Sequence, residues 1–151
     1  MRTAPDFRKN RIRYCVIYGD TDQMGVVYYA NYLRWFEKGR TEFLREAGLP
    51  YTSIEQMGYR FPVAEVLCRY HRPARYDEVI VIETSLLSLG RAALRFGYIL
   101  SHEDTGIVIA EGWTRHACIN SEGRIVKIPL LLKPKLQSAL SPGPSDSQHG
   151  N

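Results

Sequence analysis

Apolar and polar residues alternate near the start of the chain and then change their period. Apolar or aromatic side chains stand at every second position from Ile12 to Tyr18, which is the period of a strand with one face on a core. After a loop they recur three and four positions apart, which is helical spacing. This second set is Tyr29, Tyr32, Leu33, Phe36, Phe43, Leu44 and Ala47. The pattern predicts one helix over about 31–47, capped by Asn31 and ended at Gly48.

Strand patterns fill most of the remaining chain. The predicted strands are 63–71, 79–89, 92–102 and 107–119, with a shorter extension at 125–128. Turn sequences such as Asp104-Thr105-Gly106 and Ser121-Glu122-Gly123 separate successive strands. Connections this short require antiparallel neighbours, because a parallel crossover needs about a dozen residues or more.

Two further stretches are compatible with short helices. One covers Thr52–Met57, and the other begins at Pro129, although Pro134 argues against a long helix there. The end of the chain has the Pro, Gly and Ser content of a disordered tail. We therefore divide the chain into one domain at 1–140 and a disordered C-terminal tail at 141–151.

One long helix and four or five antiparallel strands predict an α+β fold with two layers. The apolar stripe of the helix is wide and nearly all aromatic, so we expect the helix in the concave face of a curved sheet that wraps around it. Strands as long as 92–102 leave a sheet edge uncovered in so small a domain. This favours edge pairing with a second copy, and we expect a homodimer.

Composition narrows the class of protein. A chain of 151 residues with 44% hydrophobic and 24% charged residues fits one globular domain. No apolar run could cross a bilayer and no signal peptide is evident, so we expect a cytoplasmic protein. The three cysteines are far apart, and the four histidines have no metal-ligand spacing, so neither disulfides nor a metal site is expected. A net charge of +4 is too modest to indicate nucleic-acid binding.

The segment from Gly19 to Glu37 carries the most specific pattern in the chain. Its sequence, GDTDQMGVVYYANYLRWFE, resembles the signature of hotdog-fold thioesterases of the 4-hydroxybenzoyl-CoA thioesterase type, a family that includes bacterial thioesterases associated with the Tol–Pal system. A second stretch, Tyr70 to Glu78, resembles a strand-turn-strand segment of that family. The likeness spans about Arg11 to Pro129.

The resemblance implies hydrolysis of acyl-CoA thioesters, aromatic or short-chain, or of an acylated carrier protein. It places the catalytic carboxylate on Asp22, as nucleophile or general base, and the donor to the thioester carbonyl on the backbone N–H of Tyr29. Many bacterial relatives carry His where this chain has Tyr29. No cofactor is implied, since coenzyme A is part of the substrate, and the expected assembly is a homodimer or a dimer of dimers. The implied substrate-binding residues are Gly25, Val26, Val27, Tyr28 and Arg91.

Physical chemistry is compatible with these roles. The first turn of a helix has unpaired N–H groups and about half a positive charge, which can stabilise an oxyanion. The spacing alone indicates that Asp20 and Asp22 both cap turns. The resemblance favours a catalytic role for Asp22 instead and leaves Asp20 as a structural residue. Glu37 is a reserve catalytic carboxylate, although a solvated or Arg-paired role is the better interpretation. Arg91 is equally well read as a solvated turn residue, because the family's basic cluster is largely missing around it.

Two alternatives to an enzyme stay open. The first is a non-catalytic protein that binds acyl-CoA or an acyl carrier on the same fold. The second, a basic nucleic-acid module, rests on the net charge and ranks last. A Ser-His-Asp hydrolase is disfavoured, because the chain has no Gly-x-Ser-x-Gly motif.

Overall fold

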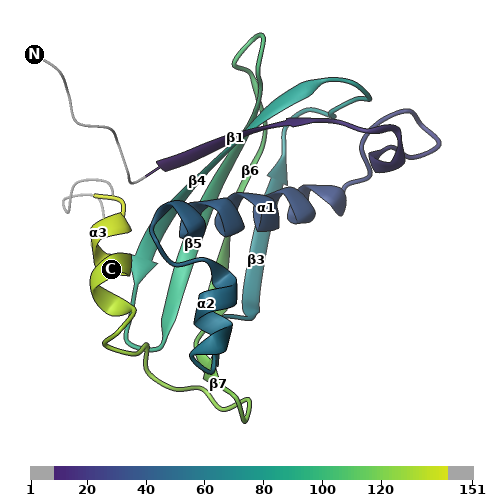
Figure 1. Cartoon of the computed structure of the whole chain (residues 1–151). Coiled ribbons are helices and arrows are strands. Elements are labelled where there is room, and N and C mark those ends of the chain that lie inside the picture. The colour runs from purple at the N-terminus through teal and green to yellow at the C-terminus, as the bar shows by residue number, and fades with distance from the viewer. Residues whose placement is uncertain (1–8, 143–151) are drawn as a thin grey trace, which may run out of the picture.

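One antiparallel sheet and one long helix make up the two layers of the molecule (Figure 1). The computed structural model describes residues 9–142. In sheet order the strands are β1 (Lys9–Cys15), β4 (Val79–Leu89), β5 (Ala93–His102), β6 (Val108–Ala117) and β3 (Val63–Tyr70). The helix α1 (Asn31–Glu46) lies along the concave face of this sheet. The predicted α+β fold, a long helix wrapped by a curved antiparallel sheet, is confirmed.

Shorter elements close one end of the sheet. They are α2 (Tyr51–Gln56), β2 (Tyr59–Arg60), β7 (Ile119–Asn120) and α3 (Lys133–Ala139). Helix α2 confirms the predicted short helix at 52–57. The predicted strand at 125–128 is wrong, because Ile125 makes a single bridge to Ile119.

Helix α3 and the chain end also depart from the prediction. The helix begins at Lys133 and not at Pro129, with Pro134 in its first turn, where the missing N–H would have had no partner. It is seven residues long, which agrees with the prediction against a long helix. Ser141 donates its backbone N–H to the carbonyl of Leu86 at 2.9 Å, so ordered contacts reach into the predicted tail. The rest of that predicted tail, 143–151, lies outside the described residues.

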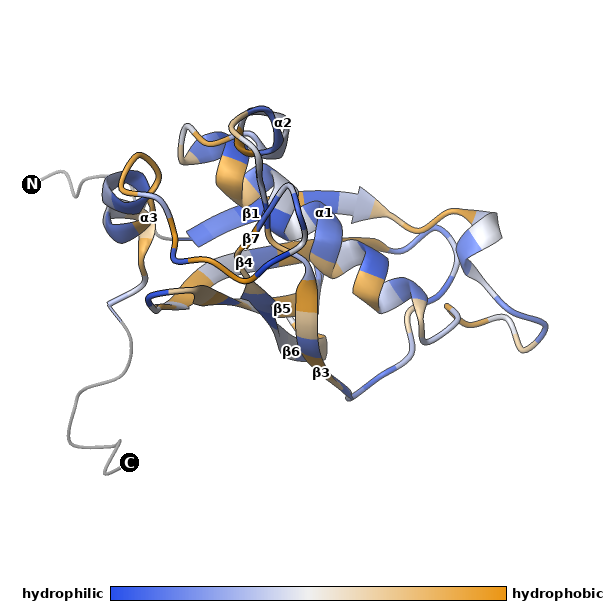
Figure 2. Cartoon of the chain, turned by 90° about the horizontal axis from the view of Figure 1, so that it is seen from below, coloured by the Kyte–Doolittle hydropathy of each residue, from blue (hydrophilic) through white to orange (hydrophobic). Residues whose placement is uncertain are grey.

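The aromatic face of α1 forms the centre of the core. Phe36 stacks on Tyr98 of β5 with ring centroids 4.2 Å apart and an interplanar angle of 6°, and Phe43 meets Phe96 edge-on at 5.6 Å. Figure 2 shows apolar and polar segments alternating along α1, as expected for a helix with one buried face. Burial of each such side chain is worth roughly 2 kcal/mol, so this face fixes the helix on the sheet.

Gly39 interrupts the aromatic stripe at a point of close approach. A Cβ atom there would lie 2.9 Å from Cγ2 of Ile82 and still closer to Oγ1 of Thr84. Two side chains of β4 therefore occupy the space that a side chain at residue 39 would need.

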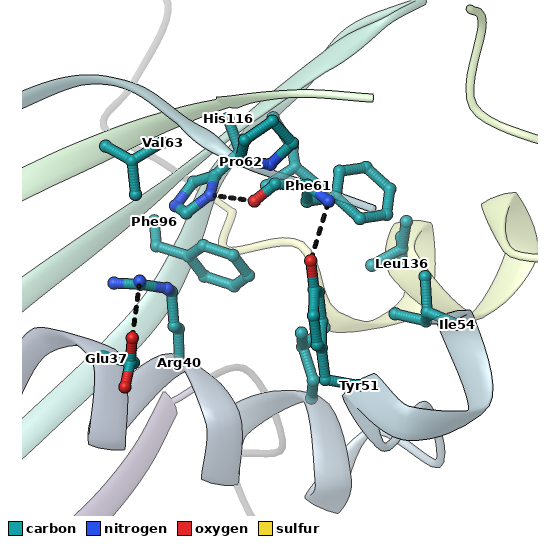
Figure 3. A pocket seen from close by; sticks show the side chains of 12 residues that line it. Glu37, Arg40, Tyr51, Ile54, Phe61, Pro62, Val63, Phe96, His116 and Leu136 are labelled. Carbon is teal, nitrogen blue, oxygen red and sulfur yellow. Dashed lines mark hydrogen bonds and ion pairs between the residues drawn. The ribbon is translucent and has the colours of Figure 1, made fainter. Parts of the chain in front are cut away.

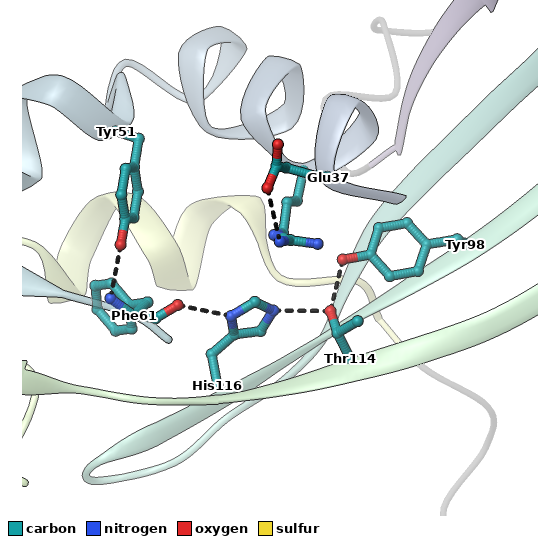
Figure 4. Close-up of polar contacts among 7 residues, drawn as sticks. Glu37, Tyr51, Phe61, Tyr98, Thr114 and His116 are labelled. Carbon is teal, nitrogen blue, oxygen red and sulfur yellow. Dashed lines mark hydrogen bonds and ion pairs between the residues drawn. The ribbon is translucent and has the colours of Figure 1, made fainter. Parts of the chain in front are cut away.

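Four consecutive hydrogen bonds connect β5 with α2 across the end of the sheet (Figure 4). Tyr98 Oη lies 2.6 Å from Oγ1 of Thr114, which lies 2.7 Å from Nε2 of His116. Nδ1 of His116 lies 2.8 Å from the carbonyl oxygen of Phe61, whose N–H donates to the hydroxyl of Tyr51 at 2.9 Å. This chain of contacts holds the segment before β3 against the sheet.

The carbonyl oxygen of Phe61 fixes the direction of the three hydrogen bonds between it and Tyr98. A carbonyl oxygen can only accept, so His116 Nδ1 donates to Phe61, and Nε2 of the neutral ring accepts from Thr114. Tyr98 then donates to Thr114. Burial lowers the pKa of His116 to about 4, and the charge of Arg40 adds to this effect against the bond to Phe61.

This neutral histidine predicts acid sensitivity. Between about pH 6.5 and pH 4 the unfolded chain protonates His116 and the folded chain does not, so the free energy of unfolding falls as the pH is lowered. We expect a loss of about 1–2 kcal/mol between pH 6.5 and pH 5 in urea unfolding. His116→Gln should lack this part of the slope, and equal slopes for the two proteins would contradict the assignment.

Candidate active site

Asp20 is buried and holds the entrance to the candidate site together. Its Oδ2 atom accepts hydrogen bonds from the Tyr14 hydroxyl at 2.7 Å and from the N–H of Ile17 at 3.0 Å. Its carbonyl oxygen accepts from the N–H of Tyr28 at 2.9 Å and from the side-chain amide of Asn31 at 2.8 Å. Burial and the bond to Asp20 raise the pKa of Tyr14 to about 12. These contacts agree with a structural role for Asp20.

Asp22 is exposed, and its side chain is compatible both with capping the turn and with a catalytic role. Oδ1 accepts from the N–H of Met24 at 2.8 Å, which is the turn-capping contact. The backbone of Asp22 pairs with Val26, and Thr21 bridges Val27, so the loop is a small antiparallel hairpin. Among the described residues, Oδ2 has no hydrogen-bonding partner. One carboxylate oxygen therefore shapes the turn and the other is free for chemistry.

Gly25 closes this hairpin in the left-handed region. Its φ is +80°, and its N–H donates to the carbonyl oxygen of Asp22 at 3.0 Å. A Cβ at Gly25 would meet nothing within 4 Å, so the conformation and not the space requires glycine.

The N–H of Tyr29 is unpaired within residues 9–142. The N–H groups of Asn31, Tyr32 and Leu33 bond to carbonyl oxygens three residues earlier, so the first free donors of the helix entry lie before them. The cap residue of α1 is Ala30, without a side-chain cap bond, and the predicted capping role of Asn31 was wrong. The helix start therefore offers a donor in the positive field of the helix.

Tyr70, at the end of β3, holds Tyr29 in place. Its hydroxyl donates to the carbonyl oxygen of Tyr29 at 2.9 Å, and the two rings meet edge-on at 6.5 Å. Partial burial is the main cause that raises the pKa of Tyr70, and the neighbouring Cys68 thiol raises it further. The hydroxyl therefore keeps its proton. No sequence pattern indicated this role for Tyr70, although it is the first residue of the second family-like stretch.

An open groove of about 290 Å³ lies beside this helix start. Its lining residues are Val27, Tyr29, Tyr32, Tyr70, His71, Arg72 and Pro73. Tyr28 lies next to it, with its ring 4.5 Å from that of Tyr29. Asp22 is not among the groove's described lining residues. The groove therefore offers an aromatic wall and two basic side chains to a ligand next to the free N–H.

The structure gathers most of the predicted site residues into one loop. Val26 bridges Arg75, and the N–H of Val27 donates to the carbonyl oxygen of Ala74 at 2.8 Å, so both are anchored to the segment after β3. Glu37 is exposed on α1, and its carboxylate lies 3.7 Å from Arg40. This position supports the Arg-paired interpretation of Glu37.

Arg91 lies far from this loop within one chain. The loop follows Cys15, which pairs with Val79 at the start of β4, whereas Arg91 follows the other end of that strand. A strand of 11 residues is about 35 Å long. Asp22 and Arg91 of one chain are therefore too far apart to contact the same reacting group.

The described part of the chain has neither a metal-binding cluster nor a membrane-spanning helix. Residues 9–142 contain no group of three or more His, Cys, Asp and Glu side chains that could hold a metal ion. Over the same residues, no helix combines the length and apolar character needed to cross a membrane.

Comparison with known proteins gives consistent matches. The family profile described as the thioesterase-like superfamily matches residues 16–140. The acyl-CoA thioester hydrolase YbgC of Escherichia coli O157:H7 is 31% identical over 121 residues, which are 80% of this chain and 83% of that protein.

Solved structures agree with this match. The hypothetical protein TT1821 from Thermus thermophilus has a TM-score of 0.81 at 39% identity, covering 85% of this chain and 98% of that one. A 4-hydroxybenzoyl CoA thioesterase mutant complexed with 4-hydroxybenzoyl CoA has a TM-score of 0.78 and covers 85% of this chain and 99% of its own. At 20% identity this second likeness concerns the fold alone.

Proposed function

The chain belongs to the thioesterase-like superfamily, and from this premise we propose that it hydrolyses acyl-CoA thioesters to the free acid and coenzyme A. The observation that carries the proposal is the unpaired N–H of Tyr29 at an uncapped helix start, in the same short segment as a carboxylate with one free oxygen. Both belong to the segment between the end of β1 and the start of α1. The aromatic groove beside them favours aromatic or short acyl groups.

The proposed reaction begins with the thioester carbonyl oxygen accepting a hydrogen bond from Tyr29 N–H. As the carbonyl carbon is attacked, negative charge grows on that oxygen, and the donor and the helix field stabilise it by about 3 kcal/mol. Asp22 either attacks the carbon itself, forming an anhydride that water then cleaves, or takes a proton from the attacking water. In both routes the C–S bond breaks, and coenzyme A leaves as a thiolate that is then protonated.

A carrier-protein substrate is compatible with the same chemistry. Gly25 shapes the turn, Val27 lines the groove and the ring of Tyr28 lies against that of Tyr29, so we assign these residues, together with Val26, to substrate binding. The reaction uses the side chains and backbone of the protein, and coenzyme A enters as part of the substrate.

We further propose that two copies pair through β3. This strand is at the edge of the sheet, and six of its eight residues are exposed. An unpaired edge of this kind readily pairs with a second copy, and a two-fold axis would make the two β3 strands antiparallel. The Tyr70 end of one copy would then meet the Val63 end of the other. Arg91 of the second copy would approach the groove in this way, which its position within one chain does not allow.

A dimer of dimers has a separate candidate surface. Leu87 and Ile99 are 44% and 42% exposed, on the sheet face away from α1. Contacts through that face would leave the β3 edges free for the first pairing.

A binding protein without turnover is the second candidate function. It is favoured by one observation: Asp22 already caps the turn through Met24 and is not among the described residues that line the groove. In this alternative the helix start would bind the thioester carbonyl, and no group would attack it.

Substitution of Asp22 tests the catalytic proposal. We expect Asp22→Asn to lower kcat/KM by about 10²–10⁴-fold across benzoyl-CoA, 4-hydroxybenzoyl-CoA and butyryl-CoA, because the amide can neither attack nor accept the proton. Asp104→Asn, at another exposed turn, is the matched control and should retain wild-type rates.

Three results would contradict the proposal in different ways. Equal rates for wild type and Asp22→Asn would remove Asp22 from the mechanism. A comparable loss in Glu37→Gln alone would move catalysis to the helix carboxylate. Tight binding of acyl-CoA without turnover by the wild type would favour the binding protein.

Substitution of Val66, near the midpoint of β3, tests the pairing. Light scattering should give the wild type about twice the chain mass of 17.3 kDa. Val66→Lys should shift the mass toward the monomer, because two like charges would face each other near the axis. Leu130→Lys, which replaces a residue 84% exposed elsewhere, should stay dimeric. A monomeric wild type, or a dimeric Val66→Lys protein, would exclude this interface.

A further inference from the structure

A second cavity lies on the C-terminal half of α1 (Figure 3). Its volume is about 270 Å³. The apolar part of its wall consists mainly of Leu44, Tyr51, Ile54, Phe61, Phe96 and Leu136. Arg40 lies nine residues after the first residue of α1, which corresponds to about 14 Å along the helix axis. Within one chain, this cavity is therefore separate from the groove at Tyr29.

Arg40 brings an under-paired charge to this apolar wall. Its side chain is 17% exposed, whereas that of Glu37, its ion-pair partner, is 71% exposed. The atoms closest to each other, Nη2 of Arg40 and Oε1 of Glu37, are 3.7 Å apart, which is longer than a charge-assisted hydrogen bond. Within the described residues, no other carboxylate lies within ion-pair distance of Arg40. A mostly buried guanidinium with five N–H donors thus has one loose, solvated counter-ion.

The polar groups around Arg40 do not supply the missing negative charge. His116 is neutral and is already bonded at both ring nitrogens. Burial raises the pKa of Tyr98, and the charge of Arg40 opposes this rise without cancelling it, so the phenol keeps its proton. The site therefore combines a fixed cation, neutral neighbours and an apolar wall, which is the complement of a small organic anion.

The size of the cavity limits the apolar part of such a ligand. A dry cavity of about 150 Å³ lined by apolar side chains accepts benzene. At about 270 Å³, the Arg40 cavity has room for a ring of that size together with one planar anionic group. Arginine recognises a carboxylate through two parallel N–H contacts, a geometry that Glu37 does not make here.

We propose that this cavity binds the anion of a small carboxylic acid, with the carboxylate on Arg40 and a benzene-sized apolar body against Leu44 and Phe96. This is the chemical class of the acid that the proposed hydrolysis releases, and in that respect the inference rests on the proposed function. The binding itself does not depend on turnover. Glu37 competes for the guanidinium in the empty site and is displaced by the ligand.

Calorimetric titration with benzoate and with benzamide tests the charge requirement. The two molecules share size and shape, and we expect wild-type protein to bind benzoate at least about tenfold more tightly than benzamide. Arg40→Gln should abolish this preference. Glu37→Gln should strengthen benzoate binding severalfold, because it removes the competing carboxylate from the surface. Arg34→Gln, which alters an exposed arginine of the same helix, should leave both affinities unchanged.

Several results would overturn the inference. One is equal affinity for benzoate and benzamide, and another is an Arg40→Gln protein that keeps the preference. If Arg40→Gln does not fold, Glu37→Gln decides, since an unchanged or weaker affinity for benzoate contradicts the proposed competition.

The same titration separates this cavity from the catalytic site. Asp22→Asn should bind benzoate with wild-type affinity, and a loss of binding there would place the acid at the Tyr29 groove and overturn the inference. If the wild type hydrolyses no thioester but still shows Arg40-dependent benzoate binding, the proposed function fails and the anion site stands.

Discussion

Burial of the aromatic face of α1 in the curved sheet is the constraint on which the other features depend. The stack of Phe36 on Tyr98 and the edge contact of Phe43 with Phe96 fix the helix along its length. With the middle of the helix fixed, its first turn must face the loop that follows β1, and its last turns must face α2 and α3. One packing interaction thus positions both the helix-start donor at Tyr29 and the cavity beside Arg40.

The periodicity of apolar residues predicted the helix and strands that pack against the core. It was a poorer guide where one side chain could have more than one local role. The helix and four long strands follow from apolar spacing, because burial of one face decides their structure. Asn31 looked like a helix cap, but its amide reaches back to the carbonyl oxygen of Asp20. The last helix was expected to begin at Pro129, but it begins at Lys133, with Pro134 in its first turn. Both outcomes depend on where the neighbouring segment lies, which local sequence does not specify.

The candidate site shows the same division. The loop residues from Asp22 to Tyr29 are contiguous in the sequence, so a sequence motif could identify them as one group of site residues before the structure was available. Tyr70 and Arg40, in contrast, reach their sites through tertiary contacts. Tyr70 bonds to the carbonyl oxygen of Tyr29, and Arg40 lies beside an apolar wall formed by several elements. Arg91 illustrates the reverse case, since a motif position placed it at the site and the length of β4 separates it from Asp22 within one chain. Symmetric pairing through β3 is the arrangement that could reunite them.

In the proposed reaction, a thioester carbonyl binds to the free N–H of Tyr29 with residue 22 next to its carbon. A crystal structure of Asp22→Asn with an intact acyl-CoA bound is the sharpest test of this arrangement. We expect the thioester oxygen about 3 Å from the backbone nitrogen of Tyr29, with the side chain of residue 22 against the carbonyl carbon. A thioester oxygen bound elsewhere, with the Tyr29 N–H left to water, would contradict it.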